Sequence, residues 1–309
     1  MPPRRSRLVS DCGAAPPQRT WPTYCHPMSP PSTTSAGARR RRPRHLAGRP
    51  VGRLTLVVAV VATLVGCSTA APASTAVVAT PANGTTLDLA VPASTAALPL
   101  VDQAGRTVTL ASLRGTTVVL VDFLSLCQEV CPLTSANVRA VSDALDAAHL
   151  SGEVRILEAT VDPARDTSPR LAAYQKLYGA KPNWSFVTGT SPVVSALWKS
   201  FGVGYEKTST TATPPPKDWL TGAPLTYDVD HQDVVIVIGP DGHERWLVDG
   251  TPRIASASSV PSPLQSFLNE EGHANVTAPA DPTWTAADVM SAVQYVVTSA
   301  SPGSSGATR

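Results

Sequence analysis

The sequence of 309 residues is poor in features that would point to several common functions. Methionine occurs three times, at Met1, Met28 and Met290, so the chain is not a methionine-rich metal carrier. Positive charge is scarce beyond residue 66, where 14 Lys and Arg stand against 22 Asp and Glu, a net charge of −8. Because binding to nucleic-acid phosphates needs clustered Lys and Arg on the folded part, we exclude that class.

The apolar run at residues 54–66 is too short to span a bilayer as a helix. It has 13 residues, whereas a spanning helix needs roughly 20. It follows a basic segment with seven arginines at 39–53 and ends in Leu-Val-Gly-Cys, which resembles a bacterial lipobox. We therefore expect residues 1–66 to be an N-terminal extension and lipoprotein signal peptide, with Cys67 lipidated and the domain on the outer face of the cell membrane. An uncleaved single-span anchor is the alternative, and it gives the same outward orientation.

The remaining chain divides into a tether, a domain and a tail. Residues 67–97 are rich in Ala, Ser, Thr and Pro without apolar periodicity, which is typical of a tether. We place the folded domain at 98–272 and expect 273–309 to be a polar tail with one closing helix at 286–297. A Pro-rich stretch at 208–225 is either a loop whose tip contacts a partner or a plain insertion.

Within the domain, predicted strands and helices alternate. Apolar runs predict strands at 116–124, 154–161 and 184–187. Helical spacing of apolar residues, with Pro near each start, predicts helices at 132–150, 168–178 and 192–201. A Pro-Asp-Gly-His turn joins strands 234–238 and 245–248 into a hairpin. Since β-α-β units require parallel strands, the fold class is α/β and thioredoxin-like, in three layers, with a central mixed sheet flanked by helices and a late β-hairpin.

Five cysteines reduce to two thiols once the leader is removed and Cys67 is lipidated. Cys127 and Cys131 are four residues apart, at the end of a predicted strand and the start of a helix. Free N–H groups and the helix dipole favour thiolates there. Two thiolates suit Cu(I), and a neutral imidazole would complete a three-coordinate site. A structural disulfide is the alternative, although closing so short a loop stabilises little.

Six histidines could supply that imidazole. Five lie in the leader, at a helix end, on a hairpin turn or in the tail: His26, His45, His149, His243 and His273. Only His231 opens a predicted buried strand. From position alone, a core or solvated histidine without a ligand role is the more common case.

Several motifs occur in one order along the chain. They are Cys-Gln-Glu-Val-Cys-Pro at 127–132, Val-Asp-Pro-Ala-Arg-Asp-Thr at 161–167, Phe-Gly-Val at 201–203, Asp-His at 230–231 and Ile-Gly-Pro-Asp-Gly at 238–242. Together they resemble the Sco/SenC family of copper chaperones, which are thioredoxin-like proteins that help assemble the binuclear CuA centre of cytochrome c oxidase. The first motif is similar to the family's Cys-Pro-Asp-Val-Cys-Pro, and the resemblance covers about residues 98–267.

The resemblance implies a copper site and a role. Cys127, Cys131 and His231 would be the copper ligands, and Asp230 a neighbouring carboxylate that orients the site. The chain would be a metallochaperone that delivers copper to the CuA-bearing subunit of cytochrome c oxidase, with other copper carriers or thiol reductants as further partners. The alternative is a thiol-disulfide oxidoreductase, in which Cys127 attacks a partner disulfide and Cys131 resolves the mixed disulfide.

Two motifs also raise structural expectations. Gln128 and Glu129 replace the family's Pro and Asp, and we expect Glu129 to be a solvated carboxylate without a role. In the second motif we expect Asp166 or Thr167 to cap the next helix and Arg165 to pair with a carboxylate.

Overall fold

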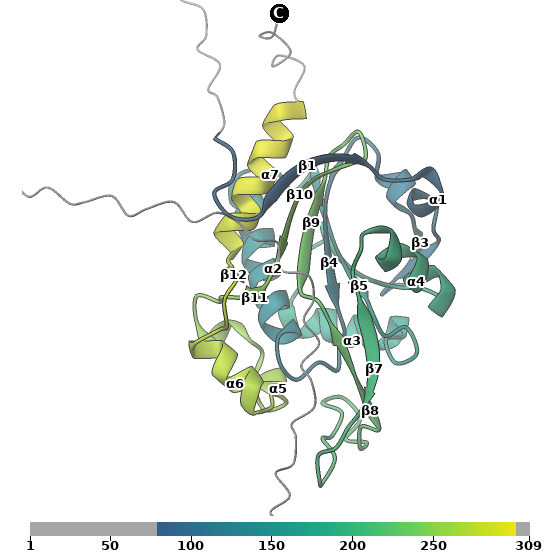
Figure 1. The fold of residues 1–309 in the computed structure, drawn as a ribbon, viewed down its shortest axis with the longest axis vertical. Helices are drawn as coiled ribbons and strands as arrows, with labels where there is room; N and C mark the ends of the chain where they lie inside the picture. Colours follow the sequence, from purple (N-terminus) through teal and green to yellow (C-terminus); the bar gives the residue numbers. More distant parts are fainter. Residues whose placement is uncertain (1–78, 301–309) are drawn as a thin grey trace, which may run out of the picture. The chain divides into compact units, whose positions relative to one another are not determined.

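The computed structural model describes residues 79–300 and centres on an eight-stranded sheet (Figure 1). In spatial order the strands are β1 (Thr85–Ala90), β10 (His243–Asp249), β9 (Val234–Ile238), β4 (Thr117–Phe123), β5 (Val154–Thr160), β6 (Trp184–Thr188), β2 (Leu100–Asp102) and β3 (Thr107–Val108). The central strands β4, β5 and β6 are parallel, and every other neighbouring pair in this sheet is antiparallel.

Helices lie on both faces of the sheet (Figure 1). On one face α2 (Cys131–Ala147) contacts α3 (Ser168–Tyr178), as right-handed crossovers between β4, β5 and β6 require, and α2 also contacts α7 (Ala286–Ala300). On the other face α1 (Ala93–Ala96) contacts α4 (Ser191–Ser200) and the 3-10 helix η1 (Leu110–Leu113).

Two further groups of elements lie outside the main sheet. The strands β7 (Tyr205–Ser209) and β8 (Tyr227–His231) form an antiparallel ribbon. Between β10 and α7 the chain forms β11 (Thr251–Pro252), η2 (Ala257–Ser259), α5 (Ser262–Gln265), α6 (Glu270–Thr277) and β12 (Thr283–Trp284). Within residues 79–300, no helix combines the length and the apolar character needed to cross a membrane.

The predicted fold class is confirmed. Parallel β4, β5 and β6 beside antiparallel β9 and β10 form the thioredoxin-like arrangement, and each predicted strand and helix occurs with its ends shifted by no more than three residues. All seven residues of β4 are buried, because helices cover both faces of the sheet at its centre. Phe123 at its end packs against Tyr174 and Phe186, with ring centroids 5.6 and 5.2 Å apart.

The structure corrects three expectations. Thr85–Ala90, inside the expected tether, pair with β10 as an edge strand whose side chains are mostly exposed, so the segment shows no apolar periodicity. The helix at residues 270–277 crosses the expected boundary at 272/273, so the expected polar tail begins inside a helix. His231 ends β8 instead of opening a buried strand, and β9 begins at Val234. The expected signal peptide and Cys67 lie outside the described residues.

Candidate metal centre

The two predicted cysteines lie where β4 passes into α2. Residues 124–130 make this connection, which we call the cysteine loop, and Cys127 and Cys131 are 7% and 0% exposed. No side chain caps α2. Instead, the backbone N–H groups of residues 129–131 donate to Cys127 Sγ at 3.4–3.5 Å. The loop therefore surrounds this sulfur with donors that favour a thiolate.

His231 approaches the cysteines from β8. Its Nε2 lies 3.3 Å from Cys131 Sγ, and its side chain is 3% exposed. On the other side of the ring, Nδ1 lies 2.8 Å from Asp122 Oδ2 and 2.5 Å from the Gln232 carbonyl oxygen. Asp122 is a buried residue of β4, and its Oδ1 accepts the N–H of Val234 at 2.7 Å. The carboxylate thus fixes the ring so that Nε2 faces the sulfurs.

The structure brings together the three side chains that the sequence singled out. The two sulfurs of Cys127 and Cys131 and one imidazole nitrogen of His231 lie within 4.8 Å of one another, and neither cysteine forms a disulfide. Two sulfurs and one imidazole nitrogen are a soft donor set, which fits a thiophilic ion such as Cu(I) and suits Mg²⁺ or Ca²⁺ poorly. The residues present therefore fit a copper ion.

The site divides charge unequally among the three groups. The hydrogen bond with Cys131 lowers the pKa of the Cys127 thiol, burial raises it, and the neighbouring His231 lowers it again. The net effect holds this pKa well below its usual range. Burial raises the pKa of the Cys131 thiol well above its usual range. Burial opposes charge on His231, but the hydrogen bond to Asp122 raises its pKa well above the usual value. A metal ion must therefore displace protons from Cys131 and His231.

Asp122, and not Asp230, contacts the imidazole. Asp230 lies in β8 beside His231, but it is exposed and points to the rim of the site. The signal for Asp122 was present in the sequence, since it is the one acidic residue in a strand of apolar and hydroxyl residues, Thr-Val-Val-Leu-Val-Asp-Phe. A buried carboxylate needs a partner, and such an isolated acid indicates one.

The site opens into a surface cavity of about 270 Å³. Its lining includes Cys127 and His231 together with five acidic residues and no Lys or Arg. The acidic residues are Glu129, Asp228, Asp230, Asp233 and Glu271. The approach to the sulfurs is therefore negative, which favours the arrival of a cation.

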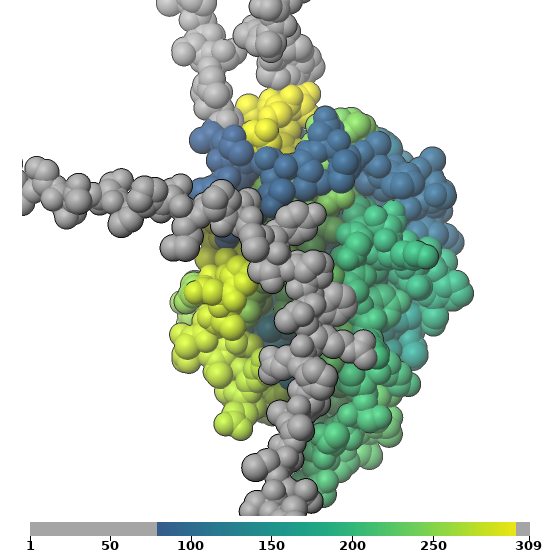
Figure 2. Space-filling view, in the orientation of Figure 1, coloured from purple at the N-terminus to yellow at the C-terminus, as the bar shows by residue number. Residues whose placement is uncertain are grey.

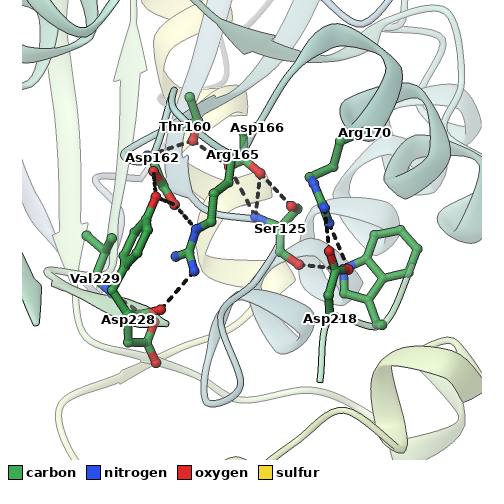
Figure 3. Close-up of polar contacts among 11 residues, drawn as sticks. Ser125, Thr160, Asp162, Arg165, Asp166, Arg170, Asp218, Asp228 and Val229 are labelled. Atoms are coloured by element: carbon green, nitrogen blue, oxygen red, sulfur yellow. Dashed lines mark hydrogen bonds and ion pairs between the residues drawn. The ribbon is translucent and has the colours of Figure 1, made fainter. Parts of the chain in front are cut away.

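Buried polar contacts hold the start of the cysteine loop (Figure 3). The Asp166 carboxylate accepts hydrogen bonds from the Ser125 N–H and hydroxyl and from the Thr160 hydroxyl at 2.5 Å. Burial raises the pKa of Asp166 to about 6. Asp166 does not cap α3, and neither does the Thr167 side chain, so that expectation is wrong. Arg165 pairs with Asp162, as predicted.

The Pro-rich stretch at 208–225 also contacts the cysteine loop. Arg170 of α3 forms an ion pair with Asp218, whose carboxylate is 6% exposed (Figure 3). The next residue, Trp219, donates its ring N–H to the Ser125 carbonyl at 2.7 Å and packs edge-on against Tyr174. The stretch is therefore anchored beside the candidate site, which neither sequence-based alternative anticipated.

Comparison with known families identifies the class of protein. The SCO1/SenC family model matches residues 92–259, more than half of the chain. The chain belongs to this family. The match includes the cysteine loop and His231, and it ends before α5 and α6.

Individual relatives are more distant. The SCO1 protein homolog of Bacillus subtilis is 31% identical over 145 residues, which are 46% of this chain and 66% of that protein. The mitochondrial SCO1 homolog of Homo sapiens is 31% identical over 116 residues, 38% of this chain and 34% of that protein. Among solved structures, copper-bound yeast Sco1 has a TM-score of 0.43 at 19% identity, covering 72% of this chain and 92% of its own. Copper-bound Arabidopsis thaliana ScoI has a TM-score of 0.40 at 22% identity, and the match covers 53% of this chain and 87% of that protein.

Proposed function

We propose that this chain is a copper metallochaperone that binds copper through Cys127, Cys131 and His231. The observation that carries the proposal is the convergence of two sulfurs and one imidazole within 4.8 Å, with the ring held by the buried Asp122. Family membership and the copper-bound relatives support the same metal.

From the protonation of the site we propose an order in which the three ligands bind copper. Cys127, already favoured as thiolate, offers the first sulfur to an arriving Cu(I). Cys131 then loses its thiol proton, and His231 loses the proton on Nε2 while Nδ1 keeps its hydrogen bond to Asp122. Transfer to an acceptor reverses this order, because the acceptor's ligands replace the three donors one at a time and the protons return.

The proposed destination is the CuA-bearing subunit of cytochrome c oxidase. The motifs of residues 127–132 and 161–167 and the SCO1 relatives support this assignment. We further propose that the protein acts on the outer face of the cell membrane, anchored through a lipid on Cys67. Palmitate labelling of the chain and of Cys67→Ala tests the anchor, since label retained by the variant would contradict it.

A second candidate is thiol-disulfide exchange with an exported partner. The asymmetry of the thiols favours it, because Cys127 is the more exposed and has the lowered pKa, while Cys131 is fully buried. Cys127 would attack the partner disulfide and Cys131 would resolve the mixed disulfide. This activity needs both sulfurs but not a ligand at His231.

Copper bound per protein decides between the two. The reduced chain is loaded with Cu(I) under anaerobic conditions and compared with the His231→Ala and Cys131→Ser variants. His243→Ala is the matched control, since His243 lies on the surface and pairs with Asp88. We expect one equivalent in the parent and the control and strongly weakened binding in the two site variants. A parent that retains no copper but reduces disulfides would refute the chaperone function.

A further inference from the structure

The segment after the family match reaches back to the cysteine loop. Residues 261–280, which include α5 and α6 and which we call the C-terminal cap, lie beside Gln128 and Glu129. Figure 2 shows the yellow-green cap and the green β7–β8 region forming the surface on the two sides of the lower half of the view. Residues from both segments line the cavity in front of the sulfurs.

Three hydrogen bonds join the cap to the loop. The Gln128 side-chain amide donates to the Phe267 carbonyl at 3.0 Å, and the Asn269 N–H donates to the Gln128 carbonyl at 3.0 Å. The Asn269 side-chain amide donates to Glu129 Oε1 at 2.8 Å. Glu129 is half-buried and bonded, so the expectation of a solvated carboxylate without a role is wrong.

The cap and the loop also pack without space between them. A Cβ added to Gly272 of α6 would lie 2.2 Å from the Gln128 carbonyl oxygen, so a side chain there would push the cap away from the loop. The same Asn269 side chain accepts the Gly272 N–H at 2.8 Å and thereby caps α6. One residue thus both begins α6 and holds Glu129.

The two bonded loop residues are the two that differ from the family motif. A proline at position 128 would have no side-chain amide to donate to Phe267. Gln128 and Glu129 therefore bond to Phe267 and Asn269, two residues that lie beyond the family match. The loop residues that differ from the family motif and the segment after the family match are therefore in direct contact.

We infer that Gln128, Glu129 and Asn269 are positioning residues that fix the cysteine loop around the metal ligands. The loop has no regular structure of its own, and in this conformation its N–H groups at 129 and 130, with that of Cys131, donate to Cys127 Sγ. The cap holds the loop at Gln128 and Glu129, and Asp166 and Trp219 hold it at Ser125, so that the two sulfurs are preorganised for the ion. The consequence for copper rests on the proposed function, whereas the effect on the loop does not.

A charge-neutral exchange of partners tests the inference. Asn269→Asp keeps the cap of α6, because Asp caps helices as well as Asn, but it faces the Glu129 carboxylate with a second carboxylate. Adding Glu129→Gln restores a donor and an acceptor with the same net charge as the parent. Gln265→Ala is the matched control, since its amide lies in the same cap but bonds only to the carbonyls of Ala257 and Val260.

Two measurements give separate answers. Hydrogen exchange of the amides at 129–131 in the reduced, metal-free chain reports on the loop, and Cu(I) competition reports on affinity. For Asn269→Asp we expect faster exchange and affinity lowered by about five- to tenfold, with the double variant within about twofold of the parent. The added negative charge alone would strengthen cation binding, so a loss of affinity reports the broken contact.

Specific outcomes would overturn the inference. Unchanged exchange and affinity in Asn269→Asp, failure of Glu129→Gln to restore them, or an equal loss in Gln265→Ala would each do so. If the parent binds no copper, the proposed function fails, while the exchange measurements still decide whether the cap positions the loop.

Discussion

The carboxylate of Asp122 offers the sharpest test of the site. In Asp122→Asn the side chain keeps its size and can still accept the Val234 N–H, now 2.7 Å from Oδ1. The other end becomes an NH2 group facing Nδ1 of His231, at the position of the present 2.8 Å contact. Because two donors cannot share a hydrogen bond, the Gln232 carbonyl at 2.5 Å is then the acceptor left for the Nδ1 proton.

This change removes the negative charge that orients the ring and supports the imidazole as a metal ligand. His231 and Asp122 have side chains 3% and 0% exposed, so water cannot replace the lost interaction. Loss of such a supporting carboxylate costs about 10- to 100-fold in metal affinity, or about 1.4–2.8 kcal/mol. We expect the affinity for Cu(I) to fall within this range, and the pKa of His231 to fall as well because the hydrogen bond to Asp122 raises it.

Competition with a chromophoric Cu(I) chelator measures the affinity, and NMR titration of the imidazole measures the pKa. Asp230→Asn is the matched control, because it removes the same charge from an exposed residue next to His231. A control that loses as much affinity as Asp122→Asn would attribute the effect to charge alone. An Asp122→Asn affinity within twofold of the parent would refute the role of the carboxylate.

Three further predictions concern the surroundings of the site. Trp219→Phe removes the 2.7 Å hydrogen bond to the Ser125 carbonyl. We expect the free energy of unfolding in urea to fall by about 1 kcal/mol and the cysteines to be alkylated faster. Unchanged alkylation would contradict the role of Trp219 in holding the cysteine loop. Arg170→Met leaves the nearly buried Asp218 with hydrogen bonds from Leu220 and Thr221 but without an opposite charge. This should cost about 2–3 kcal/mol in the same assay at pH 7, whereas a loss below about 0.5 kcal/mol would contradict it. Burial raises the pKa of Glu158 from 4.5 to about 8. Between these pH values the folded state keeps the carboxyl proton that the unfolded state loses, so the free energy of unfolding falls as pH rises from about 4.5 to 8. Glu158→Gln should flatten this dependence and raise the melting temperature at pH 8.5, and an equal slope in both proteins would contradict the assignment.

The sequence predicted those parts of the fold that bury apolar faces. β4 and α2 were predicted because a buried strand and an amphipathic helix carry strong periodic patterns. β1 was missed because it lies at the sheet edge with mostly exposed side chains, and its pairing with β10 depends on backbone hydrogen bonds. α6 was missed because a polar helix of eight residues has little stability of its own and depends on packing, here against the loop at Gln128.

The candidate ligands show the same division. Cys127 and Cys131 were found from their spacing, and His231 from its motif, because these signals are local in sequence. The partner of His231 was assigned to Asp230 instead of Asp122, because the contact spans 109 residues and depends on how β8 lies against β4. Long-range pairs of this kind are visible in sequence only as an isolated acid in a buried strand.

The origin of the three donors explains why so many distant contacts converge here. One sulfur lies on the cysteine loop, which has no regular structure, and the other on the first residue of α2 that follows it. The loop is held by Asp166 and Trp219 through Ser125 and by the cap through Gln128. The imidazole comes from a ribbon that is not part of the main sheet. Without these contacts, the loop and the ribbon would each have to be ordered by the incoming ion, at the expense of binding free energy. Asp122 joins the ribbon to β4 through His231, so the central strand that ends at the cysteine loop also fixes the third ligand, and the donor set is assembled before the metal arrives.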